Sequence, residues 1–595
     1  MPNLFNKHFQ VNETSHEIGS SCTFVKFQLV VIKTSHLLHF LCFINNIRYN
    51  YINNSFSENY YFISLSSFFC NNITIMNYSN LTKKKIIIVG AGVAGLTAGI
   101  YCLDNGFDVE IYEKHSIPGG ECTGWTRRGQ YIDGCAHWIV GTNPRSELYP
   151  LWEHIGAFDG NPAVFETEYI TKFALDDGRI FTFWSDIDKL YDEMMTFFPE
   201  DKKNIRSFIN TVKAYQTIHV PAKKPLDHMN MFEFIPFGLS MLPAAYPFLH
   251  YKHISVGEYI QRFHNKELGE IINRFMEENY NIHSFFYICQ AVSKKDAGMI
   301  EGGSLELIKR VTNKFTHAGG VLHVNAPVKK ILIENDNAKG IELENGEIVK
   351  ADYVIAACDA AHTLNKLLEG KYVDEEFKEQ FNNPVASPIN TSVMLAFKTK
   401  RNLNDYPKMM DFKVEEFSLW GKPTSHIGIR NFSFDKTLPA LHGETLLTVL
   451  IPANELVYNT LKAMPREEYL AEKQKFGNFI LNIMKEKMGL KDGEIDLIDV
   501  TTPLTYERYT NAYMGSYMSF ITTKFTKGLM KPGLIKGLHN FVIAGQWIMP
   551  PGGLPIALIS GKHACQRVCK MERKKFVNKE TKFHLSLSLK EPNVA

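Results

Sequence analysis

The chain has 595 residues, of which 45% are hydrophobic and 22% are charged, and its formal net charge is +2. This length and composition indicate a globular protein with more than one domain, and the near-zero charge gives no reason to expect a nucleic-acid partner. The ten cysteines are scattered and include no Cys-x-x-Cys pair, so we expect reduced thiols in an intracellular protein and no structural metal.

Residues 1–75 differ from the rest of the chain, because they are rich in Asn, Phe, Ile, Tyr and Ser. The partly apolar stretch 24–44 contains Lys26 and Lys33, which makes it poor as a membrane span. No basic segment leads into an apolar one as in a secretory signal. We expect residues 1–75 to lie outside the fold with Met76 as the functional start; a disordered extension and an unusual targeting segment are the alternatives. We therefore expect a cytoplasmic or peripheral membrane location.

A strand, a glycine-rich turn, a helix and a second strand follow one another in the first ordered segment. The β-branched run 86–89 predicts a buried parallel strand, and residues 109–112 predict the next one. Residues 94–105 between them predict a helix, with Gly106 at its end. The order is that of a βαβ unit that binds a dinucleotide.

Gly90, Gly92 and Gly95 have the Gly-x-Gly-x-x-Gly spacing of such a unit. The first glycine permits the tight turn, the second lets a pyrophosphate approach the backbone, and the third lets the helix pack on the strand. The helix N-terminus then faces the phosphates. Glu113 ends the second strand, where it can accept bonds from ribose hydroxyls and disfavours a 2′-phosphate. A nicotinamide dinucleotide and a flavin both remain open at this point.

Two further glycine-rich segments favour the flavin. Gly119 and Gly120 bring a second flexible backbone stretch close to the first loop. Residues 541–544 predict a strand that ends at Gly545 and Gln546, and the run 552–555 leads into a helix from about Ile556. Because an extended FAD needs contacts beyond one βαβ unit, these segments predict closure over the rest of a flavin.

The middle of the chain predicts another helix and several strands. Ser304 is expected to cap a helix whose apolar residues follow a helical period. The strands that follow are expected at residues 321–324, 328–334, 339–343, 347–349 and 353–356, with a turn at Asn345-Gly346.

These three segments, together with Thr501–Met518 and the closing Gly-Gln-Trp and Pro-Pro-Gly-Gly-Leu-Pro motifs, resemble a known family. They are similar to the FAD-dependent oxidoreductases of the phytoene desaturase, carotenoid isomerase and retinol saturase group, within the flavin amine-oxidase-like fold. The resemblance covers roughly residues 83–570. It implies an α/β fold, in which a Rossmann-like FAD-binding domain of the glutathione-reductase/amine-oxidase type is interleaved with an α+β substrate domain.

The resemblance also implies how the chain divides. An N-terminal extension is expected at 1–75 and a tail at 576–595. The expected FAD-binding domain consists of residues 83–149, 298–363 and 531–575, and the expected substrate domain of residues 150–297 and 364–530.

The resemblance implies a bound FAD and a set of residues that hold it. In the family, the position of Val328 meets the adenine through its backbone, and the position of Gln546 is often an Asp or Glu that bonds the ribityl chain. Glu121 stands where many relatives carry Arg. The expected cofactor-binding residues are Gly90, Gly92, Val93, Ala94, Gly95, Glu113, Lys114, Gly119, Gly120, Val328, Gly545, Gln546, Gly552, Gly553 and Leu554.

Two aromatic or apolar stretches are candidates for contact with a substrate. Residues 231–253 are strongly apolar but contain three prolines, which break any single helix. They predict either an interfacial segment that guards an apolar tunnel, with peripheral membrane contact, or a buried pair of short core helices. Tyr509, Tyr513 and Tyr517 are four residues apart, which predicts a helical stripe that lines a pocket or packs in the core.

His137 is the candidate for a catalytic polar group near the flavin ring, and the alternative is a histidine held by backbone contacts. The resemblance implies hydride exchange between flavin N5 and a carbon–carbon double bond of an apolar polyene, isoprenoid or retinoid-like substrate, in desaturation, saturation or isomerisation. The alternatives are a flavin amine oxidase and a non-catalytic protein similar to Rab GDP-dissociation inhibitors. No second complete glycine motif follows a strand, so NAD(P) is an open electron partner without a dedicated site. The oligomeric state is not predicted.

Overall fold

The computed structural model describes residues 83–135, 138–166, 168–373, 375–438, 443–528 and 530–581. Residues 1–82 are a separate unit from the rest of the chain. The predictions on the N-terminal extension, on His137 and on most of the tail lie outside the described residues.

A five-stranded parallel sheet joins three segments that are far apart in the sequence. Its order is β10-β2-β1-β14-β20, and all four pairings are parallel. Ile86, Ile87 and Ile88 on the central strand are completely buried, as expected for a sheet covered on both faces. The bounds are β1 Lys85–Val89, β2 Asp108–Tyr112, β10 Val321–His323, β14 Tyr353–Ala356 and β20 Phe541–Ile543.

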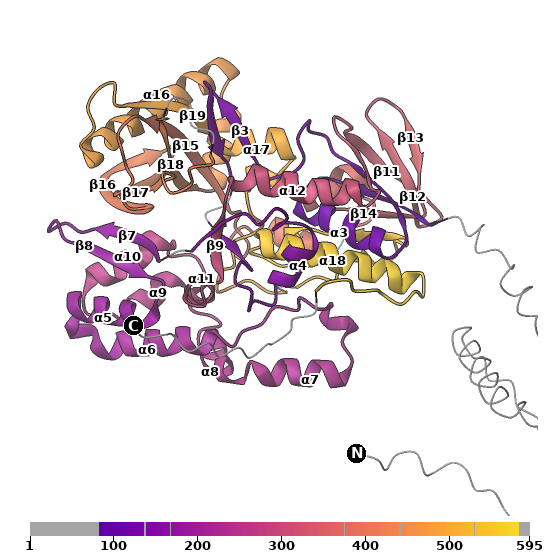
Figure 1. The fold of residues 1–595 in the computed structure, drawn as a ribbon, viewed down its shortest axis with the longest axis horizontal. Coiled ribbons are helices and arrows are strands. Elements are labelled where there is room, and N and C mark those ends of the chain that lie inside the picture. The colour runs from indigo at the N-terminus through magenta and orange to yellow at the C-terminus, as the bar shows by residue number, and fades with distance from the viewer. Residues whose placement is uncertain are drawn as a thin grey trace, which may run out of the picture. The chain divides into compact units, whose positions relative to one another are not determined.

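Helices pack against this sheet, as Figure 1 shows for α3 (Val93–Asp104), α12 (Gly303–His317) and α18 (Leu554–Met571). The first and last helices approach each other closely, because a Cβ on Gly561 would lie 2.5 Å from the carbonyl oxygen of Ala94. The two ends of the described chain therefore meet in one core.

A three-stranded antiparallel sheet follows α12, with the order β11-β12-β13. Its strands are β11 Val328–Glu334, β12 Asn337–Leu343 and β13 Ile348–Lys350, close to the predicted ranges. The predicted cap of α12 is wrong. Gly302, with a φ of 81°, is the N-cap, and Ser304 lies inside the helix, where its hydroxyl donates to Asp133 at 2.9 Å. The Ser304 hydroxyl, which was predicted to bond the first turn of α12, instead bonds the buried Asp133 carboxylate.

A seven-stranded sheet lies beside this region, in the order β19-β15-β18-β17-β16-β7-β8. Its core contains Leu395, Val449 and Ile480, all completely buried, the last of them from the covering helix α16 (Arg466–Met488). The strands are β7 Tyr169–Ala174, β8 Ile180–Trp184, β15 Thr391–Thr399, β16 Met409–Leu419, β17 Lys422–Asn431, β18 Thr445–Ala453 and β19 Ile495–Thr501.

A helical layer packs next to β7 and β8 around Phe208, Phe285 and Phe286. It contains α5 Ile187–Phe197, α6 Lys202–Tyr215, α9 Val256–Ile260, α10 Lys266–Phe275 and α11 Ile282–Ser293. The remaining short elements include β3 Gly124–Arg127, β4 Gln130–Asp133, β5 Ile139–Val140, β6 Val164–Phe165, β9 Ala297–Ile300, α4 Tyr149–His154, α13 Ala360–His362, α14 Glu375–Asn382 and α15 Glu455–Ala463.

The apolar stretch with three prolines forms two helices, α7 (Met231–Ser240) and α8 (Leu242–His250), which meet at an angle of 69°. Among the described residues, no single helix is long and apolar enough to cross a membrane. The alternative of a buried core pair is wrong for α7, which buries none of its ten residues. Figure 1 shows α7 at the margin of the ribbon.

The predicted tyrosine stripe is also wrong as a helical feature. Helix α17 (Pro503–Thr510) ends at Asn511, whose φ is 59°. A short 3-10 turn, Tyr513–Gly515, follows. Tyr509, Tyr513 and Tyr517 therefore do not share one helix face, because the chain turns after the first of them.

Candidate FAD site

The candidate site lies at the carboxyl edge of the five-stranded sheet. Since parallel strands end on the same side, Gly90 after β1, Glu113 after β2, Ala357 after β14 and Gly545 after β20 come together there. This edge is where sheets of this kind bind their ligands.

The first loop needs its glycines. Gly90 has a φ of 101°, and a Cβ on it would lie 3.0 Å from the carbonyl oxygen of Ala357. Gly92 is the N-cap of α3 and brings no side chain to the helix end, so the amides of Val93 and Ala94 begin the helix without a side-chain acceptor. This leaves the positive end of α3 for an anionic group.

The predicted glycine pair lies directly against this loop. Gly92 forms a bridge with Gly119, and the Gly119 amide donates to the carbonyl of Ala91 at 2.9 Å. A Cβ on Gly120 would lie 3.5 Å from the Cα of Gly92. The two backbone segments therefore form one surface of nearly bare backbone, which lets a pyrophosphate approach closely.

Glu113 is buried and is held by two backbone amides. Its Oε2 accepts from Ala91 and its Oε1 from His115, each at 2.8 Å. Each carboxylate oxygen keeps a further lone pair for a ribose hydroxyl. Val328 opens β11, and the chain leading to it lies close by, because the amide of Ala326 donates to the Glu113 carbonyl at 2.8 Å.

Lys114 was expected among the cofactor contacts, and its side chain bonds the C-terminal end of α17. Its Nζ donates to the Arg508 carbonyl at 3.0 Å and to Asn511 Oδ1 at 2.5 Å. Burial lowers the pKa of Lys114. The side chain ties the end of α17 to the end of β2, and so holds α17 over this edge of the sheet.

The closing loop brings the other half of the site. Gly545 is buried, yet a Cβ on it would meet nothing within 4 Å, so open space lies beside it. Gly552 and Gly553 have φ values of 86° and 83°, and Gly553 precedes Leu554 at the start of α18 without a side-chain cap. Gln546 Oε1 accepts from the Gly553 amide at 3.1 Å, so this side chain holds its own loop together.

Ser519 lies against this loop, because its amide donates to the Pro551 carbonyl at 3.2 Å, and Ser516 precedes it by three positions. Among the described residues, the hydroxyls of Ser516 and Ser519 are buried and make no hydrogen bond. A Cβ on Gly552 would lie 3.1 Å from the Ser519 oxygen. Buried hydroxyls normally find partners, so these two fit a ligand with polar groups. The uncapped helix ends, the space at Gly545, the Glu113 carboxylate and these hydroxyls together fit an extended FAD.

Two acidic residues lie in this site, of which sequence reasoning named Glu121 only as a departure from the family and missed Asp359. Thr510 Oγ1 donates to Glu121 Oε1 at 2.6 Å, and burial, with a smaller contribution from Asp359, raises the pKa of Glu121 to about 8. Asp359 accepts from the amides of His362 and Tyr513 at 2.8 and 2.9 Å, and burial raises its pKa to about 6. The signal for Asp359 is its place just after a predicted buried strand, as for Glu113.

His362 completes a chain of polar contacts from α13 to α17. Its Nε2 lies 3.3 Å from Asn511 Nδ2, and Asn511 in turn accepts from Lys114. Burial lowers the pKa of His362 to about 4, so its ring is neutral at neutral pH.

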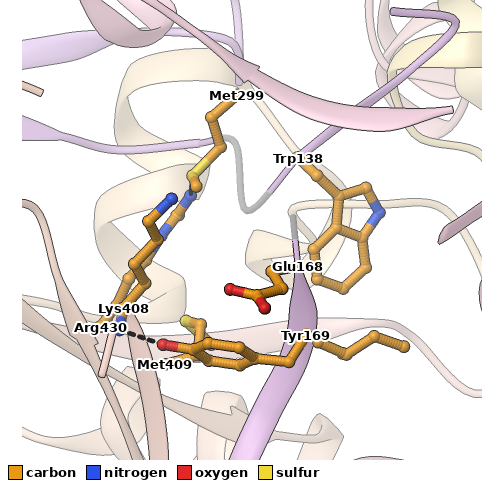
Figure 2. A pocket seen from close by; sticks show the side chains of 8 residues that line it. Trp138, Glu168, Tyr169, Met299, Lys408, Met409 and Arg430 are labelled. Atoms are coloured by element: carbon orange, nitrogen blue, oxygen red, sulfur yellow. Dashed lines mark hydrogen bonds between the residues drawn. The ribbon is translucent and has the colours of Figure 1, made fainter. Parts of the chain in front are cut away.

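Figure 2 shows a small cavity between β7, β9, β16 and β17. Its volume is about 50 Å³, which is suitable for water molecules but not for a long polyene. The Lys408 amide donates to the Tyr169 hydroxyl at 2.9 Å across its floor. Burial lowers the pKa of Arg430 to about 10, so the guanidinium stays charged. The lining residues are Trp138, Glu168, Tyr169, Ile170, Met299, Lys408, Met409 and Arg430.

His137, the predicted catalytic residue, lies outside the described residues, so its role stays a prediction. Among residues 83–581 outside the gaps, no group of three His, Cys, Asp or Glu side chains could hold a metal ion.

Comparison with known proteins identifies the family. A family model described as flavin containing amine oxidoreductase matches residues 93–569. The chain belongs to this family. It is an FAD-dependent oxidoreductase with the amine-oxidase-type α/β fold, and the resemblance to phytoene desaturases and carotenoid isomerases is confirmed.

The similar proteins have low sequence identity but cover most of the chain. The 4,4′-diapophytoene desaturase (4,4′-diapolycopene-forming) of Methylomonas sp is 22% identical, over 83% of this chain and 96% of the relative. Prolycopene isomerase 1, chloroplastic, of an Oncidium hybrid cultivar is 24% identical, over 81% of this chain and 83% of the relative. The solved structure of cyclohexylamine oxidase from Brevibacterium oxydans IH-35A covers 83% of this chain and all of its own, with a TM-score of 0.51 and 14% identity, which supports the fold alone.

Proposed function

We propose that this FAD-dependent oxidoreductase acts on carbon–carbon double bonds of an apolar polyene, isoprenoid or retinoid-like substrate, by desaturation, saturation or isomerisation. One observation carries the proposal. Relatives named as a 4,4′-diapophytoene desaturase and a prolycopene isomerase align with 81–83% of the chain, which includes the segments outside the five-stranded sheet. Those segments are where the substrate is expected to bind.

We also propose the division into two domains that was inferred from the sequence. Residues 83–149, 298–363 and 531–575 form the FAD-binding domain, which agrees with the three origins of the five-stranded sheet. Residues 150–297 and 364–530 form the substrate domain, which agrees with the seven-stranded sheet that draws on both. The substrate would then lie between the two sheets.

When bound, FAD exchanges a hydride with a substrate carbon through N5. The residues of this chain bind and orient the cofactor: Gly92 and Gly120 leave its phosphates room, Glu113 accepts from its ribose, and Ser519 and Gly553 face its other half. Three tyrosines near Ser516–Ser519, namely Tyr280, Tyr506 and Tyr517, have pKa values raised by burial. The shared cause is desolvation, and surroundings poor in water suit an uncharged, apolar substrate.

The test begins with the absorption spectrum of the purified full-length protein, in which we expect a flavin band. Anaerobic mixing with acyclic carotenoids and with retinol is then expected to change that band or the polyene spectrum. A preparation that turns over primary amines with release of hydrogen peroxide, and leaves polyenes unchanged, would overturn the proposal in favour of an amine oxidase.

A further inference from the structure

The α7–α8 pair exposes more large apolar side chains than any other pair of consecutive helices in the described part of the chain. On α7, Phe232 is 90% exposed and Met231 73%. On α8, Tyr246 is 76% and Leu249 71% exposed. The further exposed members are Phe234, Ile235, Leu239, Leu242 and Phe248. A patch of this kind marks an interaction surface.

The pair is anchored on one side only. Ala244 and Pro247 of α8 are buried, and Phe248 stacks on His283 of α11 with ring centroids 4.5 Å apart. No residue of α7 is buried. An ordinary surface helix buries one apolar face against the core, and α7 has no such buried face. Its apolar side chains are instead exposed at the protein surface.

We propose that the α7–α8 pair inserts into one leaflet of a phospholipid bilayer with anionic headgroups. The lengths fit a single leaflet, because helices of 10 and 9 residues span about 15 Å each, half the hydrocarbon thickness. The 69° bend lets both helices lie near the interface rather than cross. This is the geometry of an interfacial apolar helix.

The charges around the pair favour a lipid surface over a second protein chain. Lys223 and Lys252 flank it and are exposed, and among the described residues neither has a carboxylate within ion-pair distance. The single acidic residue of the pair, Glu233, is neutralised by Lys224 at 2.5 Å. Apolar side chains framed by uncompensated lysines match acyl chains framed by anionic headgroups.

A neighbouring loop extends the same surface. The ring nitrogen of His253, just after α8, lies 3.1 Å from the Lys524 carbonyl. Phe525 is 54% exposed, and exposed Lys527 follows, again without a carboxylate partner in the part of the chain that the structure describes. The loop thus repeats the combination of an exposed aromatic ring and a free lysine next to the helix pair.

This loop also connects the surface with the cofactor site. The Asn281 amide at the start of α11 donates to the Thr522 carbonyl at 2.7 Å, and the Ser519 amide donates to the Pro551 carbonyl at 3.2 Å. Only two residues, 520 and 521, therefore separate the contact with α11 from the contact with the loop that closes the expected FAD site. The proposed function explains this proximity, because a polyene is dissolved in the bilayer; the insertion itself rests on exposure and charge alone.

The test is flotation of the full-length protein with vesicles of phosphatidylcholine, with and without phosphatidylserine. We expect the protein to float with both, and more strongly with phosphatidylserine at low salt. Phe232→Asp is expected to weaken binding about tenfold or more, since an aromatic side chain leaves the bilayer and a charge enters. Ile348→Asp, at a 59% exposed position on β13, is the matched control and is expected to bind as the wild type does.

A second variant reports on insertion without loss of the apolar surface. Phe232→Trp is expected to bind as the wild type does, and its emission is expected to shift to the blue with vesicles. Failure of the wild type to float with either vesicle overturns the proposal. So does a dimer in solution that Phe232→Asp dissociates, because a second copy would then cover the surface. The flavin spectrum, measured on the same samples, is independent of these outcomes and reports on the proposed function separately.

Discussion

Glu121 is the most informative residue to perturb, because it stands among the glycines that line the expected pyrophosphate site and carries a carboxyl group there. Burial raises its pKa from 4.5 to about 8. Such a carboxyl opposes folding above its ordinary pKa, since the unfolded chain ionises it and the folded chain keeps it protonated. The penalty is absent below about pH 4.5, grows to about pH 8 and is constant beyond.

The magnitude follows from the same values. At about 1.4 kcal/mol per pH unit between 4.5 and 7, the full penalty at pH 7 is about 3.5 kcal/mol. Glu121 keeps partial contact with solvent, and screening reduces this to about 2 kcal/mol. The isosteric change Glu121→Gln cannot ionise and can still accept the Thr510 hydroxyl. We therefore expect the variant to be more stable than the wild type by about 2 kcal/mol at pH 7.

The assay is urea unfolding of the two proteins at several pH values between 4 and 9. The difference in unfolding free energy is expected to be near zero at pH 4 and to increase to about pH 8. Asp359, whose pKa is raised to about 6, has its own pH dependence, which both proteins share. Glu344→Gln, at an exposed position, is the control. If the wild type and Glu121→Gln show the same pH profile, the argument from burial is refuted.

Three further predictions concern the cofactor site and its support. Ser519→Ala is expected to weaken FAD binding about three- to tenfold in equilibrium dialysis, because its buried hydroxyl has no protein partner; unchanged affinity would count against that contact. Gly561→Ala is expected to lower the unfolding free energy by about 2 kcal/mol, because the new Cβ would lie 2.5 Å from the Ala94 carbonyl oxygen; a neutral result would mean that α3 and α18 are not so tightly packed. Lys562→Met is expected to cost about 3 kcal/mol in the same assay, because it removes the cation 2.6 Å from Glu580 and leaves this mostly buried carboxylate with only the Tyr101 hydroxyl as a partner; adding Glu580→Gln is expected to recover most of the loss.

Local features of the sequence sufficed for the elements around the glycine loops. The β-branched run before Gly90 is confirmed as β1, and the strand predicted at 353–356 is β14. The helix predicted from about Ile556 is α18. These predictions succeeded because strand burial, glycine turns and helix periodicity are properties of neighbouring residues.

Predictions failed where a distant residue binds a side chain, or where a helix ends earlier than its residue spacing suggests. Ser304 has a good local reason to cap α12, yet Asp133 on β4 takes its hydroxyl. The three tyrosines have helical spacing, yet Asn511 ends α17 after the first of them. For Glu121, no local signal gives the burial that raises its pKa, and its hydrogen-bond partner Thr510 is 389 residues away.

The sequence by itself determined the family, the cofactor and the strands that would carry its loops, since these depend on motifs of a few residues each. Only the tertiary structure decided which side chains gather at the edge of the sheet where FAD is expected, which carboxyl groups have a pKa raised by burial and where an apolar helix pair stays uncovered. The physical reason is that exposure, desolvation and hydrogen-bond competition depend on what other parts of the chain bring into contact, and a one-dimensional pattern does not contain those contacts.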